Sequence, residues 1–233
     1  MFSFIKTYSN ALLHLLYPHH CRSCGTDILE DEELLCIKCT SEIAETKFLT
    51  YSDNPVEKTF FGRLPLEHAG AGFYFTKDGS IRKLIFELKY KKNRQAGIYL
   101  GKKLGRLLKD SALYSNVDVL VPLPLNPKKE SIRGYNQAMV ICEGINSVWN
   151  KPIENKVVER VLFTATQTQK DRINRWENMQ DVFAVSDEIK LQGKHILLID
   201  DIVTTGATLE ACGAEILKIP GSKLSIATVA YTI

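Results

Sequence analysis

The sequence predicts an α/β fold in which a mostly parallel sheet of about five strands carries helices on both faces. From residue 71 onward, apolar stretches of strand length alternate with stretches of helical periodicity. Strands that are apolar along their whole length indicate a parallel sheet that is covered on both sides. The chain of 233 residues is long enough for one full-sized domain and a small additional unit.

The elements follow in order along the chain. Strands are expected where apolar runs occur, over residues 72–76, 117–125, 157–163, 195–200 and 224–233. Helices are expected where apolar residues repeat every three or four positions, over residues 81–88, 94–109, 134–149 and 207–219. Pro122 and Pro124 end the second strand, because proline cannot donate to a central ladder.

The chain is expected to divide into three segments. Residues 1–50 hold a short amphipathic helix and a cysteine-rich unit, and residues 66–233 hold the α/β domain. Residues 51–65 are expected to be a linker, because they carry turn-forming residues and show no apolar period.

The composition excludes several classes of protein. With 45% hydrophobic and 24% charged residues, 14 glycines and 8 prolines, the chain is neither disordered, collagen-like nor a coiled coil. No run approaches the ~20 apolar residues of a membrane helix. The first residues lack the basic start and the small-residue cleavage site of a signal peptide. We therefore expect a cytoplasmic protein that is not inserted in a membrane.

Four of the six cysteines form two CxxC pairs, Cys21 with Cys24 and Cys36 with Cys39. Each pair can direct two sulfurs at one ion, and Zn²⁺ prefers four ligands in a tetrahedron. The pattern predicts a structural zinc ribbon, with disulfides or buried thiols as the alternative. The connection over residues 27–33 is strongly acidic, so we expect this unit to contact protein and not nucleic acid.

The most specific pattern in the chain is ILLIDDIVTTGAT, residues 196–208. An apolar strand brings Asp200 and Asp201 to its carboxyl end, where open α/β sheets bind ligands. The chain then turns into a helix, and the N-terminus of a helix favours a phosphate. Carboxylates beside a phosphate can accept hydrogen bonds from sugar hydroxyls or hold Mg²⁺. The segment therefore predicts a site for a 5-phosphoribosyl group, formed by Asp200, Asp201, Thr204, Thr205, Gly206, Ala207 and Thr208; a plain turn with an aspartate cap is the alternative.

A basic stretch covers residues 82–109, where ten Lys and Arg stand against one Glu. This local charge can bind single-stranded nucleic acid, with tyrosines stacking on bases. The candidate residues are Lys89, Lys91, Lys92 and Arg94. Two alternatives stay open: a solvated helical face, and lysines that border the phosphoribosyl site.

Residues 196–208 resemble the signature by which type I phosphoribosyltransferases bind 5-phosphoribosyl 1-pyrophosphate (PRPP). A wider set of residues resembles the ComF family, which are phosphoribosyltransferase-like proteins with a zinc ribbon, associated with DNA uptake in natural competence. This set comprises VPLPLNPKKESIRGYNQA (121–138), the N-terminal LLYPHHCRSCG, and the spaced residues Arg160, Thr164, Gln167, Arg175, Asn178 and Phe183. The resemblance covers nearly the whole chain.

The resemblance implies a Rossmann-like type I phosphoribosyltransferase domain that binds PRPP together with Mg²⁺. It implies that a loop over residues 122–137 contacts pyrophosphate and that a mobile lid lies at about 164–180. The residues implied for these two segments are Lys128, Arg133, Gly134, Gln167, Arg172 and Arg175.

Two departures from the family pattern affect these implications. Asn126 stands where ComF chains have a histidine, and the arginines that usually follow are thinned, so we expect a weaker hold on pyrophosphate. Thr204 stands where purine-using relatives of the hypoxanthine type have an aspartate that handles the base. Hypoxanthine and guanine are therefore not expected as acceptors, whereas adenine, orotate or an amine stay open.

Two functions are open at this point. The first is an enzyme in which Asp200 and Asp201 are catalytic and phosphoribosyl passes from Mg-PRPP to a nucleophile with release of pyrophosphate. The second is a non-catalytic competence factor that keeps a pocket for PRPP or a nucleoside 5′-phosphate. In that role it would bind single-stranded DNA and a DNA-uptake helicase or recombination mediator.

Overall fold

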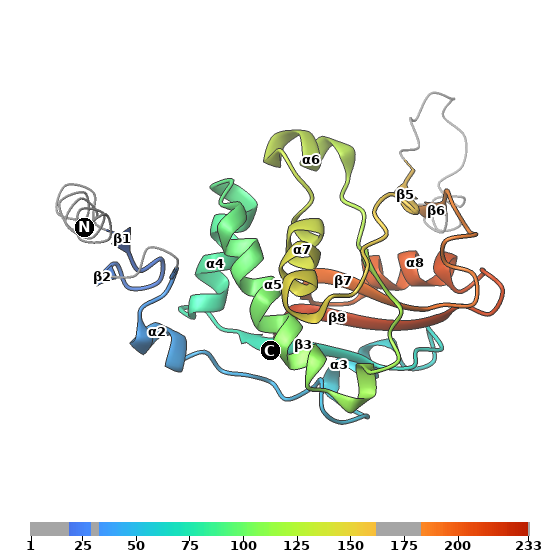
Figure 1. Cartoon of the computed structure of the whole chain (residues 1–233), viewed down its shortest axis with the longest axis horizontal. Helices are drawn as coiled ribbons and strands as arrows, with labels where there is room; N and C mark the ends of the chain where they lie inside the picture. Colours follow the sequence, from blue (N-terminus) through green and yellow to red (C-terminus); the bar gives the residue numbers. More distant parts are fainter. Residues whose placement is uncertain (1–18, 29–32, 162–182, 233) are drawn as a thin grey trace, which may run out of the picture.

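The computed structural model describes residues 19–28, 33–161 and 183–232. Its main sheet has four parallel strands in the order β3-β8-β7-β4 (Figure 1). The bounds are β3 Ala69–Phe75, β4 Val119–Pro122, β7 His195–Val203 and β8 Lys223–Thr232. The expected α/β fold with a parallel sheet is confirmed.

Helices cover both faces of this sheet, as expected from the apolar strands. In β7, Leu197 and Ile199 belong to one hydrophobic cluster and Ile196 and Leu198 to another, because successive side chains of a strand point to opposite faces. The first cluster includes the helices α4 (Ser80–Tyr90), α5 (Arg94–Lys109) and α7 (Gln137–Trp149). The second includes α3 (Pro55–Phe60) and α8 (Ala207–Ile216).

The helices α5 and α7 cross in close contact because glycines stand at the crossing. A Cβ atom on Gly101 would lie 2.2 Å from the carbonyl oxygen of Ile141, and one on Gly144 would lie 2.4 Å from that of Ile98. Hydrogen in place of a side chain lets the two backbones approach. This contact fixes α5 and α7 as one layer over the sheet.

Both edges of the sheet are covered by other parts of the chain. At the β3 edge, Glu45 pairs antiparallel with Phe73, and Thr46 N donates to the Gly72 carbonyl at 3.0 Å. At the β4 edge, Ile153 pairs parallel with Leu120. The chain therefore supplies a short fifth neighbour at 152–154.

The structure corrects three expectations. The strand expected over 157–163 is not part of the main sheet: β5 (Val158–Arg160) pairs antiparallel with β6 (Phe183–Val185). The segment 51–65 contains helix α3, which starts at the Asn54 cap and buries Val56 and Phe60 against the sheet. The segment expected as a loop over 122–137 contains helix α6 (Pro127–Arg133).

The remaining described elements are short. The strands β1 (His19–His20) and β2 (Asp27–Ile28) pair antiparallel, α2 covers Ile37–Ser41, and η1 covers Ala112–Tyr114. Figure 1 places the unit of β1, β2 and α2 at one end of the molecule and the β5–β6 pair at the other. Among the described helices, none combines the length and hydrophobicity that a membrane span requires. The N-terminal amphipathic helix lies outside the described residues, and the division of the chain at residues 50 and 65 stays a prediction.

Candidate functional site

The two aspartates lie at the carboxyl end of β7, next to the end of β4. Ile199, just before them, pairs with Pro122, so both strands end at the same edge of the sheet. Because side chains alternate along a strand, Asp201 faces the α4, α5 and α7 side and Asp200 the α8 side. The Asp200 carboxylate accepts a hydrogen bond from the Asp201 amide at 2.8 Å. The carboxylates therefore flank the crevice between two neighbouring strands, where open sheets bind ligands.

The carboxyl group of Asp200 has an unusual proton affinity. Burial, and next the adjacent Asp201 carboxylate, raise the pKa of Asp200 to about 8, while the charges of Lys89 and Arg133 act to lower it. Burial disfavours the charged form, and a like charge close by adds to that effect. A titratable group shifted in this way at the end of a central strand is typical of functional sites.

Lys89 is the cation that meets the acidic pair. It lies at the C-terminal end of α4, and its Nζ is 2.9 Å from Asp201 Oδ1. The exposed fractions of the two side chains are 19% and 7%. The sequence offered Lys89 as a nucleic-acid candidate and left open that some lysines border the phosphoribosyl site. The geometry supports the second alternative for Lys89.

The segment after β7 forms a tight turn into α8. Gly206 is the N-cap of α8 and has a φ of 74°, which disfavours any residue with a side chain. A Cβ atom there would lie 2.7 Å from the Phe60 ring. Thr204, Thr205, Ala207 and Thr208 are exposed around this glycine. The predicted phosphate-binding residues are thus brought together at the start of a helix of 10 residues.

The segment after β4 carries the residues predicted for pyrophosphate. Helix α6 starts at Asn126, whose side chain accepts from the Lys128 amide, and ends at Gly134 with a φ of 85°. Lys128 is exposed. The guanidinium of Arg133 lies 5.7 Å from the centre of the Tyr90 ring and donates to Gln137 Oε1 at 2.7 Å. Arg133 is near enough to the acidic pair for its charge to act on Asp200, whereas Lys128 lies in solvent.

A cavity of about 410 Å³ borders this segment on the side of β5. Pro124, Gly134, Tyr135 and Arg160 line it, and neither aspartate does. The lid residues predicted at Gln167, Arg172 and Arg175, together with Thr164 and Asn178, lie outside the described residues. At the base of that segment, the Arg160 guanidinium lies 5.5 Å from the centre of the Phe183 ring.

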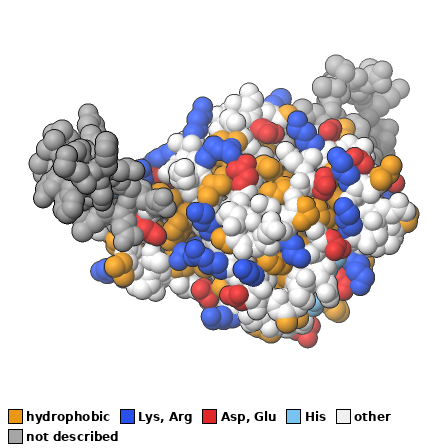
Figure 2. All heavy atoms as spheres, in the orientation of Figure 1, with side chains coloured by type: hydrophobic (Ala, Val, Ile, Leu, Met, Phe, Trp, Pro, Cys, Tyr) orange, Lys and Arg blue, Asp and Glu red, His pale blue; other side chains and the backbone are white. Residues whose placement is uncertain are grey.

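The other predicted nucleic-acid residues lie around the end of α4 but have different surroundings. Lys91 pairs with Glu87 at 3.2 Å, and Arg94 pairs with Glu143 at 2.8 Å. Lys92 is exposed, with a φ of 54°. Figure 2 shows Lys and Arg interspersed with Asp and Glu on the face drawn, and not one continuous basic surface. The charge of +9 over 82–109 is therefore partly compensated by acidic residues within and beyond this stretch.

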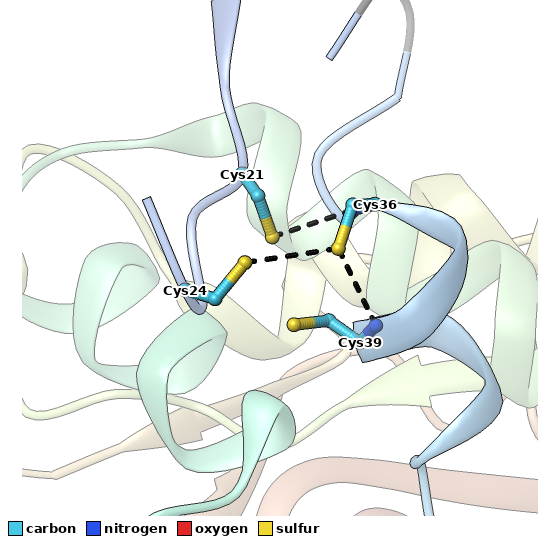
Figure 3. Close-up of side chains that lie close together, drawn as sticks. All are labelled: Cys21, Cys24, Cys36 and Cys39. Atoms are coloured by element: carbon cyan, nitrogen blue, oxygen red, sulfur yellow. Dashed lines mark hydrogen bonds between the residues drawn. The ribbon is translucent and has the colours of Figure 1, made fainter. Parts of the chain in front are cut away.

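The four cysteines of the CxxC pairs point toward one another (Figure 3). All four sulfurs lie within 4.8 Å of one another, and those of Cys24 and Cys36 are 3.7 Å apart. A tetrahedral zinc site with Zn–S bonds of ~2.3 Å requires sulfurs roughly 3.8 Å apart. The residues present therefore fit a zinc ion.

The thiol chemistry of the cluster also suits a metal. Burial raises the pKa of the Cys21 thiol, but backbone N–H donors from Cys24, Cys36 and Ser23 outweigh it and lower that pKa to about 6. Burial raises the pKa of Cys39 to about 12. The thiolate is the form that binds metals, so Cys21 is prepared for a cation whereas Cys39 needs the cation itself to lose its proton.

Comparison with known proteins adds to this geometry. The family model described as "Phosphoribosyl transferase domain" matches residues 145–232, which include β7, the turn and α8. The chain is 28% identical over 142 residues to the DNA utilization protein YhgH of Escherichia coli, covering 58% of this chain. It is 26% identical over 110 residues to Competence protein F of Haemophilus influenzae, covering 47% of this chain. It is 33% identical over 100 residues to Competence protein ComFC of Bacillus subtilis, covering 43% of this chain.

The chain is thus similar in sequence to YhgH and to the ComF proteins over part of its length. Its type I phosphoribosyltransferase fold has four parallel strands with helices, and the resemblance drawn from the sequence is confirmed. The matches span 60%, 48% and 38% of the length of YhgH, Competence protein F and ComFC. The ComF homologues thus extend beyond the parts that this chain matches.

Sequence reasoning missed two residues that the fold brings to this site. Arg63 reaches the turn after β7 from the segment expected to be a linker, and its Nη2 donates to the Thr205 carbonyl at 3.2 Å. Tyr135 donates to the Leu88 carbonyl at 2.6 Å and so ties the end of α6 to the end of α4. No local sequence pattern could reveal either contact, because each joins segments that are distant in the chain.

Proposed function

We propose that the chain binds the 5-phosphoribosyl group of Mg-PRPP or of a nucleoside 5′-phosphate at the end of β7. One observation carries the proposal: an acidic pair and the N-terminus of α8 lie together beside the end of β4. The exposed turn over residues 204–208 would hold the 5′-phosphate through backbone N–H groups and threonine hydroxyls. The aspartates would accept hydrogen bonds from the ribose hydroxyls.

The same arrangement supports a transfer reaction. In such a reaction the bond between ribose C1 and the pyrophosphate oxygen breaks, pyrophosphate leaves with the electron pair, and a nucleophile adds to C1. The Asp201 carboxylate, and that of Asp200 in its ionised form, would stabilise positive charge that develops on the ribose. Lys89 and Arg133, whose charges act on Asp200, would stabilise the negative charge that collects on the leaving group.

Bound Mg²⁺ would neutralise the pyrophosphate charge. Carboxylates are ligands that Mg²⁺ prefers, so the acidic pair fits the ion. Because Lys89 already pairs with Asp201, we expect Mg²⁺ to arrive with the ligand and not to bind first.

Calorimetric titration of Mg-PRPP into the folded protein tests the proposal. We expect binding in the micromolar range and a loss of at least about 100-fold in Asp200→Asn/Asp201→Asn, because the ribose hydroxyls lose both carboxyl groups as acceptors. Glu215→Gln is the matched control, because Glu215 lies on α8 but pairs with the exposed Lys218 and not with the turn. Equal affinity of the wild type and the double variant would refute the site. If binding is found, a panel of bases and amines with detection of released pyrophosphate decides whether transfer follows.

A second function is favoured by a pair of aromatic rings beside this site. Phe86 and Tyr90 are 51% and 64% exposed on α4, and their ring centres are 4.9 Å apart. Exposed rings among lysines are typical of surfaces that stack on the bases of single-stranded nucleic acid. The names of the relatives, DNA utilization and competence protein, support a role of this kind. We propose that single-stranded DNA binds along the end of α4, with a helicase or recombination mediator of DNA uptake as the protein partner.

Fluorescence anisotropy with a labelled single-stranded oligonucleotide tests this second function. Phe86→Ala/Tyr90→Ala should weaken binding by about 10-fold or more, since each stacked base contributes about 1–3 kcal/mol. Lys91→Glu/Lys92→Glu should weaken DNA binding more at low salt than at high salt. Tyr51→Ala is the control, because Tyr51 is 45% exposed but belongs to the segment before α3. Unchanged anisotropy curves for both double variants would exclude this surface.

We also propose Zn²⁺ as the ion of the cysteine cluster, in a structural role. A closed shell of four thiolates leaves no position for a substrate. Elemental analysis of the purified protein should find one zinc per chain, and Cys24→Ser/Cys36→Ser should lose it. A chain that folds and contains no metal would contradict this assignment.

A further inference from the structure

Arg63 lies against the turn after β7, although 142 residues separate it from Thr205. It belongs to the turn after α3, where Gly62 has a φ of 71°. Its guanidinium donates to the Thr59 carbonyl, to the Thr205 carbonyl at 3.2 Å and to the Glu210 carboxylate at 2.6 Å. It therefore joins one side of the turn to the first turn of α8.

We propose that Arg63 positions the turn over residues 204–206 and neutralises Glu210, so that a phosphate ester can bind at the start of α8. This inference rests on the proposed function of that turn. Arg63 is a positioning residue in this role, because it acts through Thr205 and Glu210.

The first step concerns the direction of one peptide group. The carbonyl of Thr205 points at Arg63, and the peptide bond to Gly206 is trans, as are all described peptide bonds. In a trans peptide the N–H points opposite to the carbonyl. The Gly206 N–H is thus turned away from Arg63. Fixing the carbonyl fixes the donor that would meet the phosphate.

The second step concerns charge. Glu210 stands in the first turn of α8 and is 31% exposed. A carboxylate there interacts well with the helix dipole but repels a phosphate bound at the same terminus. A paired guanidinium at 2.6 Å cancels this charge. Arg63 thereby lets one helix end carry both an acidic residue and an anionic ligand.

A simpler role for Arg63 would be to pin the turn mechanically. Phe60 already packs against Gly206, and the Arg63 guanidinium lies 5.8 Å from the centre of the Phe60 ring. Rescue separates the two roles. Loss of charge compensation is repaired when Glu210 is made neutral, whereas loss of a mechanical pin is not.

The test is calorimetric titration of ribose 5-phosphate into the wild type, Arg63→Met, Glu210→Gln and the double variant. We expect Arg63→Met to weaken binding about 10-fold, Glu210→Gln to bind as well as or better than the wild type, and the double variant to recover most of the loss. The loss in Arg63→Met should be larger at about pH 8 than at about pH 5.5, because a phosphate monoester gains its second charge near pH 6. Lys223→Met is the control, since it breaks another exposed ion pair, with Glu67 at 3.4 Å.

A second measurement needs no ligand. Amide hydrogen exchange at residues 205–207 should be faster in Arg63→Met than in the wild type, because the Thr205 carbonyl loses its donor. If the wild type does not bind ribose 5-phosphate, the proposed function fails, and exchange alone then decides: faster exchange supports positioning and unchanged exchange refutes it. With ligand binding intact, a double variant no better than Arg63→Met overturns the neutralising role. Arg63→Gln, which also removes the charge, replaces the methionine variant if that variant does not fold.

Discussion

The segments that follow the neighbouring strands β7 and β4 are held in different ways. The turn after β7 is fixed by residues at the end of α3. Phe60 packs against Gly206, and Arg63 donates a hydrogen bond to the Thr205 carbonyl. The segment after β4 rises into α6, in which no residue is buried. Figure 1 shows α6 projecting from the layer of α5 and α7. One ligand-binding segment is built into the core and its neighbour is not.

The difference indicates how a ligand would meet the two sides of the site. A preformed turn binds without a cost for ordering its backbone, whereas an exposed helix must first change shape to wrap a pyrophosphate. We therefore expect the 5′-phosphate of a ligand to contribute more to binding than its pyrophosphate. Ribose 5-phosphate and PRPP, used as separate probes, distinguish the two sides.

The largest effect is expected at Gly206, one of the two glycines with positive φ in these segments. Gly206→Ala should weaken ribose 5-phosphate binding by about 100-fold, because a Cβ meets the Phe60 ring at 2.7 Å and displaces the turn. Gly134→Ala is the matched variant: its φ of 85° carries a similar backbone cost, but nothing lies within 4 Å of the added Cβ. Its effect on ribose 5-phosphate should stay within about threefold. Equal losses in the two variants would remove the distinction between the segments.

Lys89 tests the side of the site where pyrophosphate is expected. Lys89→Met leaves Asp201 without its cation, so PRPP should bind about 10-fold more weakly, with a smaller change for ribose 5-phosphate. Lys92→Met is the control, because it removes an exposed positive charge just after the end of α4. It should change neither affinity by more than about twofold. Parallel calorimetric titrations of both probes measure this. An identical loss for the two probes would place Lys89 outside the pyrophosphate side.

Asp200, between the two segments, predicts a dependence of stability on pH. The pKa of its carboxyl is about 8 in the folded chain, above its ordinary value of 3.8, so between these values the folded state binds more protons than the unfolded state. Stability contributed by this group should therefore fall as pH rises, by about 1.4 kcal/mol per pH unit or a factor of about ten in the unfolding constant. Urea unfolding at several values from about pH 5 to pH 8 measures the slope.

Asp200→Asn should flatten that slope, because the amide does not titrate. Asp187→Asn is the control, since Asp187 pairs with Lys190 in an exposed position. A slope that is equally steep in Asp200→Asn would assign the pH dependence to other groups.

The smallest effect on ligand binding is expected from the cysteine cluster. The unit contacts α4 at its start, through Ser80 and Lys83, and nearer its end through Arg22, whose Nε lies 3.9 Å from Glu87 Oε2, but Lys89 itself pairs with Asp201. Removal of zinc with a chelator should leave ribose 5-phosphate affinity within about twofold, while amide exchange over residues 33–43 becomes faster. Zinc added back should restore slow exchange. A large loss of affinity on chelation would contradict this prediction and show that the cysteine unit affects the ligand site through α4.

Much of the fold could be predicted because its signals are local. The helix expected over 94–109 is observed over Arg94–Lys109, and the strands β7 and β8 occur where apolar runs were read. Asn126 and Pro127 are a good start signal for helix α6. The family resemblance nevertheless implies a loop over residues 122–137, so this helix is not predicted. The strand expected over 157–163 was assigned to the sheet, but periodicity does not say which partner a short strand takes.

The site divides in the same way. The grouping of Asp200, Asp201 and residues 204–208 could be predicted, since they follow one another in the chain. The partners of that group could not, because Lys89 and Arg63 reach it only through the packing of α4 and α3. The role of Lys89 is also hard to recognise among its neighbouring lysines. A basic helix usually indicates a solvated face or a surface that binds a polyanion, and less often one buried ion pair.

The pairing at the two sheet edges has a consequence for aggregation. An uncovered strand edge presents unpaired N–H and carbonyl groups on which another chain can add. Here Ala44–Thr46 lies along β3 and Pro152–Glu154 along β4, so neither outer strand of the sheet is left bare at those positions. A version of the protein cut back to residue 51 would uncover the β3 edge, and self-association, not loss of the ligand site, would be its first defect.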